Sequence, residues 1–329
     1  MTTKRIFRLI ALLAITFSVL CQEPSTRPLG SLRDGNLHVI LCGTGSPLAD
    51  PERASSCTAI VAGSEFVLID IGPGSWRKAD LLQLPLAELS AVVLTHFHSD
   101  HIGDLGEAIT MSWVGGRTKP LEVFGPPGVE KVVDGFQLAY QQDAGYRTEH
   151  HSLEFLPAAG ATAKGVAVEP NKVVFDRNGL RIVAFAVKHE PVRPAYGYRI
   201  EYRGRKVIIT GDTSKSEEVV RQAAGADLLI HDALSKTMIG AAASMAEGFG
   251  QQRRAKMARD IVLYHASPVE AAQTAAAAKV ATLVLTHIVP ALRNEAQQKQ
   301  FLSGTQEAFS GKIVLGRDGM RFDLPAVGQ

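Results

Sequence analysis

Three histidines and one aspartate fall within six consecutive residues of this chain, at His96, His98, Asp100 and His101. Imidazole and carboxylate groups together are typical ligands of zinc, iron and manganese. His96 and His98 alternate with Phe97, so both imidazoles point the same way if the segment is extended. Asp100 and His101 follow where the chain turns, so they can reach a second centre. Because so dense a cluster is a poor fit to an ordinary solvated turn, it predicts a metal site.

The elements that would position these groups are short apolar strands. The run at residues 91–94 leads into the cluster, and it reads as a buried strand. Strands expected at 181–187, 206–210, 227–230 and 280–286 also have a histidine or an aspartate at or just after their C-terminal ends. The residues that follow or close these strands are His189, Asp212, His231 with Asp232, and His287. Because ligands bind beyond the C-terminal ends of strands in α/β sheets, we expect these residues to share one rim.

The order of strands and helices predicts an α/β protein with two sheets packed face to face and helices outside, an αββα sandwich. One hairpin is expected over residues 197–210, and one long Ala-rich helix over residues 236–264. A helix is expected over 129–140, and Ser267-Pro268-Val269-Glu270 is typical of a helix start. The 329 residues, 46% of them hydrophobic, suffice for one large core or two modest ones.

The N-terminus has a different composition. Lys4, Arg5 and Arg8 precede an apolar run over residues 9–20, which is typical of a secretory signal and short for a bilayer span. A buried helix of the domain is the alternative. The segments that we predict are a signal peptide over 1–21, a linker over 22–36 and a single catalytic domain over 37–329. We therefore expect an exported protein, periplasmic or secreted.

The chain has three cysteines, which bear on the compartment. Cys21 ends the apolar run, so a lipid on Cys21 or the signal itself would be the membrane contact. Export would permit a disulfide between Cys42 and Cys57. Spacing alone does not fix the required geometry, so a disulfide and two buried thiols both remain open.

The segment His96-Phe97-His98-Ser99-Asp100-His101 matches the H-x-H-x-D-H motif, and through it the chain resembles the metallo-β-lactamase superfamily. Within that superfamily it is similar to tRNase Z and to arylsulfatase-like and phosphodiesterase-like hydrolases. The segments that carry this similarity are 41–46, 211–213, 231–233, 265–268 and 285–287. The resemblance runs from about His38 to the end, and it implies the αββα fold in one catalytic domain.

The resemblance implies two divalent metal ions, zinc first, with manganese or iron as alternatives. One ion would be held by His96, His98 and His189, the other by Asp100, His101 and His287, and Asp212 would bridge both. A hydroxide bridging two such ions is available near neutral pH and would be the nucleophile.

The catalytic residues that the resemblance implies are Asp100, His265 and Asp232. His265 would protonate the leaving oxygen, and Asp232 would orient it as a carboxylate orients a general acid. tRNase Z usually has glutamate where this chain has Asp232. Helix capping near Ser267 is the alternative role for His265.

Two features set the chain apart from tRNase Z. A long arm lies between the tRNase Z positions that match His189 and Asp212, whereas 22 residues separate them here. An exported protein would also not meet precursor tRNA. The net charge of +2 gives no strong field for nucleic acid.

We therefore expect a hydrolase of small phosphodiesters or related esters, with a small anionic ester as its partner and no nucleic acid. A homodimer is compatible with this expectation. The alternatives are a β-lactamase or lactonase-type hydrolase of the same fold, or a tRNase Z-like endoribonuclease. A non-catalytic metal-binding protein is disfavoured, because the complete ligand set is present.

Overall fold

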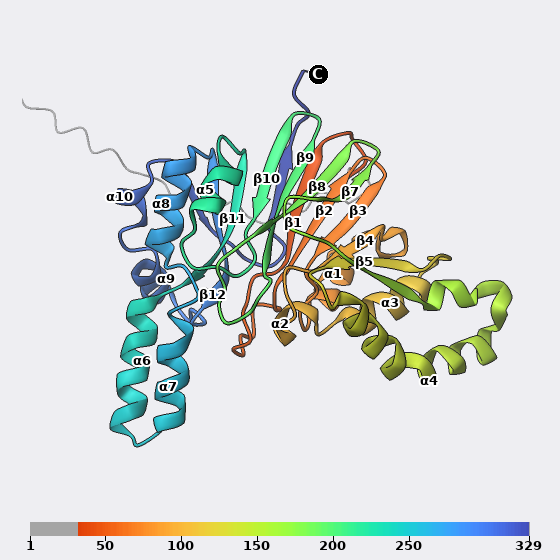
Figure 1. Cartoon of the computed structure of the whole chain (residues 1–329), viewed down its shortest axis with the longest axis horizontal. Coiled ribbons are helices and arrows are strands. Elements are labelled where there is room, and N and C mark those ends of the chain that lie inside the picture. Colours follow the sequence, from red (N-terminus) through yellow and green to blue (C-terminus); the bar gives the residue numbers. More distant parts are fainter. Residues whose placement is uncertain (1–31, 329) are drawn as a thin grey trace, which may run out of the picture.

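The computed structural model describes residues 32–328 (Figure 1). The predicted signal peptide, 1–21, and residues 22–31 of the predicted linker lie outside the described residues, so both stay predictions. Within the described residues, two seven-stranded sheets face one another, and helices cover their outer sides. This is the predicted αββα sandwich, so the fold class is confirmed.

The first sheet has the order β14-β1-β2-β3-β4-β5-β6. β2 and β3 form an antiparallel hairpin, and β3 to β6 run parallel. β1, β2 and β3 are buried along their whole length because both faces of the sheet are covered. The strands are β1 (Leu37–Gly43), β2 (Cys57–Ala62), β3 (Glu65–Ile69), β4 (Ala91–Val93), β5 (Leu121–Gly125), β6 (Ala163–Ala167) and β14 (Arg321–Leu324).

The second sheet has the order β13-β12-β11-β10-β9-β8-β7. Its strands β10 to β13 run parallel, and β7 to β10 alternate in direction. The C-terminal ends of β8, β10, β11 and β12 therefore lie at the same edge. The strands are β7 (Val173–Arg177), β8 (Leu180–Ala186), β9 (Tyr196–Tyr202), β10 (Arg205–Ile209), β11 (Leu228–Leu234), β12 (Thr282–Val289) and β13 (Lys312–Leu315).

The helices form the outer layers. Helices α1 (Ser75–Leu81), α3 (Leu105–Val114) and α4 (Val129–Phe155) pack on the first sheet. Helices α5 (Glu217–Ala223), α8 (Pro268–Ala278), α9 (Glu295–Phe301) and α10 (Thr305–Ala308) lie on the second. The short α2 (Ser99–Ile102) follows β4, while α6 (Lys236–Gly248) and α7 (Gln252–Ile261) project from the sandwich (Figure 1). In residues 32–328, no helix is both long and apolar enough to cross a membrane.

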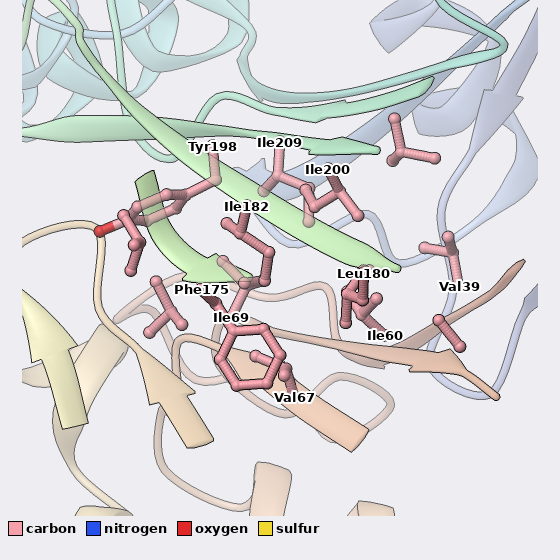
Figure 2. Close-up of a cluster of buried hydrophobic side chains, with 14 of the residues drawn as sticks. Val39, Ile60, Val67, Ile69, Phe175, Leu180, Ile182, Tyr198, Ile200 and Ile209 are labelled. Atoms are coloured by element: carbon pink, nitrogen blue, oxygen red, sulfur yellow. The ribbon is translucent and has the colours of Figure 1, made fainter. Parts of the chain in front are cut away.

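The main core lies between the sheets. Figure 2 shows β-branched and leucine side chains of the two sheets meeting there, with Tyr198 at one end. Val39, Ile60 and Ile69 of the first sheet are at most 1% exposed, as are Ile182 and Ile200 of the second. Burying each such side chain contributes about 1.5–3 kcal/mol. This apolar layer therefore holds the two sheets together.

Two helix predictions differ from the structure. The single helix expected over 236–264 is wrong, because the chain reverses at Phe249-Gly250-Gln251 and forms α6 and α7. Gly250 has φ +69°, a conformation that glycine adopts without strain. Helix α4 extends to Phe155, with a kink at Ser152, where φ is +69°. It thus passes the end predicted at residue 140, and its far part extends past the first sheet (Figure 1). Cys42 and Cys57 are buried free thiols.

Candidate active site

The structure brings the predicted site residues together at the edge where the strands end. Seven elements or loops supply them, and they come from both halves of the sandwich, so the site forms only when the sandwich is assembled. His96 and His98 follow β4, Asp100 and His101 lie in α2, His189 follows β8, Asp212 follows β10, Asp232 lies in β11, His265 lies between α7 and α8, and His287 lies in β12.

A β-bulge places His287. Asp232 of β11 pairs with Thr286, but Ala233 pairs with Ile288, so His287 is left over in the ladder. Its φ of +48° lies in the left-handed region, which non-glycine residues seldom adopt. Bulges re-aim side chains beside active sites, and here the imidazole Nε2 comes to 3.1 Å from Oδ2 of Asp100.

The first group of possible ligands contains three histidines. The Nε2 atom of His96 lies 2.9 Å from Nδ1 of His98. The Nε2 atom of His189 lies 3.4 Å from Nδ1 of His98. With Asp212, these residues offer four donor atoms within 4.8 Å of one another, which is close enough for one metal ion.

The second group combines one carboxylate with two imidazoles. The Oδ2 atom of Asp100 lies 3.6 Å from Nε2 of His101 and 3.1 Å from Nε2 of His287. Their donor atoms also lie within 4.8 Å of one another. The local turn in α2 therefore separates Asp100 and His101 from His96 and His98, as the sequence predicts.

Asp212 lies between the two groups. Its Oδ2 atom is 3.3 Å from Nε2 of both His101 and His287. The same oxygen is 3.9 Å from Nε2 of His96 and 3.8 Å from Nε2 of His189. Burial opposes its charge, but His287 and His101 outweigh burial and hold the pKa of Asp212 well below its usual value. Asp212 is therefore an anion that touches both groups.

The protonation of three of the imidazoles, those of His96, His98 and His189, suits coordination. Burial, with His101 nearby, lowers the pKa of His96 well below its usual value. Burial is also the main cause that lowers the pKa values of His98 and His189. These three rings are therefore neutral at pH 7, which is the form that binds metals. For His101, burial opposes the charge, but the carboxylates of Asp212 and Asp70 outweigh it and raise the pKa.

Several buried polar atoms in the site have no hydrogen-bond partner among the described residues. They include Nε2 of His101 and Oδ1 of Asp212. Buried polar atoms are normally paired, so unpaired ones call for an explanation. Imidazole and carboxylate donors with free lone pairs at these separations fit divalent metal ions, zinc, manganese or iron.

Asp232 and His265 form a separate pair beside the ligand groups. Nδ1 of His265 lies 3.0 Å from Oδ2 of Asp232, and Nδ1 of His231 lies 3.0 Å from its other oxygen. Burial opposes the charge on Asp232, but hydrogen bonds with His231 and His265 lower its pKa. The His265 ring stacks on that of His287 with centroids 5.3 Å apart. The pair thus adjoins the ligands, as predicted.

Asp70 is a site residue that the sequence reasoning missed. Its Oδ2 atom accepts hydrogen bonds from Nδ1 of His101 and from Oγ1 of Thr95, each at 2.8 Å. Its other oxygen accepts the Thr95 backbone N–H at 2.8 Å. These contacts fix the ring of His101 and the start of the loop. Asp70 directly follows β3, so the rule of polar residues at strand ends could have found it.

Replacing Asp70 with asparagine is expected to weaken metal binding by about 10–100-fold, because carboxylate partners orient metal-binding histidines and raise their basicity. Competition with a chelator, measured on purified protein, would give the affinity. Asp80→Asn, at an exposed position of α1, is the control and should leave the affinity unchanged. Equal affinities for the Asp70 variant and the unmodified protein would contradict the role given to Asp70.

Solved structures resemble the whole sandwich. The metallo-β-lactamase fold protein YhfI from Bacillus subtilis aligns with a TM-score of 0.64 at 21% identity, over 88% of this chain and 99% of that one. The short form of human tRNase Z aligns with a TM-score of 0.61 at 23% identity, over the same shares of the two chains. At this identity the likeness shows the fold.

Curated proteins found by sequence are more similar to this chain than these solved structures are. Ribonuclease Z of Mycobacterium marinum is 39% identical over 294 residues, which cover 88% of this chain and 99% of the relative. Ribonuclease Z of Mycobacterium tuberculosis H37Rv is 36% identical over 291 residues, which cover 98% of the relative. These matches span almost the entire length of both relatives.

The expectation of a small phosphodiester substrate and no nucleic-acid partner is therefore wrong. It depended on the short segment between His189 and Asp212, on the predicted export and on the low net charge of +2. The match to the M. marinum ribonuclease Z extends over 294 positions and 88% of this chain, so the relative has no long arm inserted in it either. The short segment thus does not separate this chain from ribonuclease Z proteins, and the endoribonuclease alternative is the better supported one.

A family model described as a β-lactamase superfamily domain matches residues 65–288, which include every ligand candidate. That range begins in β3 and ends in β12, so it covers strands of both sheets. The sandwich fold, the relatives and this match agree. The chain belongs to the metallo-β-lactamase superfamily of hydrolases, and its relatives within that superfamily include ribonuclease Z proteins of mycobacteria.

Proposed function

We propose that this chain is a metal-dependent endoribonuclease that hydrolyses a phosphodiester bond in a tRNA precursor. The observation that carries the proposal is its 36–39% identity to ribonuclease Z proteins over 94–99% of their length. The short form of human tRNase Z shares the fold, and tRNA is the substrate that its name gives. The paired ligand groups support hydrolysis of a charged ester.

Two divalent ions, zinc first, would occupy the site. His96, His98 and His189 would hold one ion, Asp100, His101 and His287 the other, and Asp212 both. When bound, such a pair activates water and neutralises charge that develops on the phosphate. Asp212 and Asp100 would keep two cations close together by offsetting their mutual repulsion.

The remaining residues would handle the leaving group. The oxygen of a water molecule forms a bond to the phosphorus and that water gives up a proton to the solvent, while the bond to the leaving ribose oxygen breaks and that oxygen takes up a proton. Because Nδ1 of His265 faces Asp232 at 3.0 Å, its other nitrogen is left to donate that proton. Asp232 accepts the hydrogen bond from Nδ1 and so orients the ring.

The test compares two substrates, a precursor tRNA with a 3′ extension and bis-p-nitrophenyl phosphate. We expect cleavage of the RNA at one bond, with kcat/KM larger for the RNA by on the order of 10³-fold, because binding energy from distant contacts lowers the barrier. The value for the RNA should fall steeply with salt, while the value for the small diester should not. Hydrolysis of the small diester with the RNA left intact would contradict the proposal.

A further inference from the structure

The α6–α7 hairpin, residues 235–263, is inserted between the two members of the Asp232–His265 pair. The chain leaves the site through β11, reverses at Phe249-Gly250-Gln251 and returns directly to His265. The backbone N–H of Leu234 donates to the carbonyl of Ala266 at 2.9 Å, which closes the base of the hairpin. Leu234 and Ile239 pack there against Ile261 and Val262. The hairpin is thus anchored at the site.

The hairpin extends well beyond this anchor. Figure 1 shows α6 and α7 side by side, projecting from the edge of the sandwich where β12 ends. The 13 residues of α6 correspond to roughly 20 Å at the usual helical rise. A ligand held near the tip of the hairpin would therefore lie far from the reacting bond. Such a ligand would have to be part of a large substrate whose reacting bond reaches the candidate metal-binding residues.

Helix α7 is strongly basic. It carries four basic residues and one acidic residue within ten positions, namely Arg253, Arg254, Lys256, Arg259 and Asp260. Lys256 pairs with Asp260 at 2.8 Å and Arg259 pairs with Glu247 at 2.8 Å. Arg253 and Arg254 are exposed and, among the described residues, have no acidic partner within ion-pair distance. The basic charge of α7 is thus only partly balanced within the hairpin.

The arrangement of these charges favours an anionic partner. Arg253 and Lys256 are three residues apart, so they lie on the same face of α7 and repel each other. The other projecting helix, α4, has the opposite character, with five acidic residues (Glu130, Asp134, Asp143, Glu149 and Glu154) and two basic ones, Lys131 and Arg147. The net charge of the whole chain is only +2, although α7, in the hairpin beside the site, is locally basic.

The tip of the hairpin exposes an aromatic ring. Phe249 is 75% exposed, among the most exposed large apolar side chains of the described residues. It lies in the turn, directly before α7 and its arginines. Aromatic rings beside basic groups are typical of surfaces that stack on unpaired bases while cations contact the phosphates.

We propose that the α6–α7 hairpin is an RNA-binding surface, on which Arg253 and Arg254 contact phosphates of the tRNA substrate and Phe249 stacks on an unpaired base. This inference rests on the proposed function and names the part of the chain that binds the RNA away from the cleaved bond. The hairpin supplies binding and leaves the chemistry to the site.

The test is the double variant Arg253→Ala/Arg254→Ala, assayed with precursor tRNA and with bis-p-nitrophenyl phosphate over a range of salt. We expect KM for the RNA to rise by about 10-fold or more at low salt. The slope of log KM against log salt should fall by about 2, one unit for each lost phosphate contact. The kcat for the RNA and both constants for the small diester should remain unchanged. Phe249→Ala should raise KM for the RNA without changing the slope.

The control is Lys131→Ala/Arg147→Ala on α4, which removes the same charge from the other projection and should leave KM and slope unchanged. If the unmodified protein cleaves no RNA, the proposed function fails. If it cleaves RNA and the hairpin variant keeps its KM and slope, only the inference about the hairpin is overturned. A hairpin variant that changes the oligomeric state while keeping its KM for RNA would identify the surface as a contact between copies and would also overturn the inference.

Discussion

Replacing Asp212 with asparagine is expected to reduce metal content from about two ions per chain to one or none, and to lower kcat by on the order of 10³–10⁵-fold. The carboxylate is the anion that touches both ligand groups, with one oxygen 3.3 Å from His101 and His287. Asparagine has nearly the same shape but lacks the charge that offsets repulsion between two cations. Metal analysis and steady-state kinetics on precursor tRNA would measure both effects.

The control for this variant is Asp134→Asn, which makes the same change at an exposed position of α4. It should retain metal and activity. An Asp212 variant that binds two ions and cleaves RNA at a near-normal rate would rule out a bridging role. Unchanged secondary structure by circular dichroism would show that the loss does not come from unfolding.

Replacing His265 with alanine is expected to lower kcat on precursor tRNA by on the order of 10²–10⁴-fold while metal content stays unchanged. The leaving ribose oxygen is strongly basic and needs a proton as the bond breaks. The p-nitrophenolate ion leaves without one, so hydrolysis of bis-p-nitrophenyl phosphate should fall much less. Asp232→Asn should show the same pattern with a smaller loss, because the ring is still present but is held less well.

The comparison between the two leaving groups separates a proton donor from a structural residue. A residue that only supports the fold would reduce both reactions alike. His150→Ala, at an exposed position of α4, is the control and should affect neither. Equal losses on both substrates after the His265 change would contradict its role as a general acid.

Local patterns predicted the parts of the site that lie close together in sequence. His96, His98, Asp100 and His101 lie within one turn after β4, and the rule that ligands follow strand ends also found His287. The contact between His287 and Asp100 joins residues 187 positions apart. It depends on a bulge and a positive φ in β12, and neither feature has a clear signal in the residues around it.

The substrate class was misjudged for a physical reason. The net charge is a sum over the whole chain. The positive charge of α7 and the negative charge of α4 cancel in that sum, so the value of +2 does not reveal the basic surface. The sequence also did not reveal the reversal at Gly250, because the residues on both sides of it favour helix. The two-sheet core was easier to predict, since its strands are continuous apolar runs such as residues 228–230.

The most direct test of metal-dependent RNA hydrolysis follows precursor tRNA cleavage by the same preparation before chelation, after chelation and after zinc is returned. The account predicts cleavage at one bond, its loss when the metal is removed, and its recovery as zinc approaches two ions per chain. The Asp212→Asn protein should show no recovery. RNA cleavage that continues at full rate in the metal-free protein, or a zinc-loaded protein that leaves the RNA intact, would contradict the account.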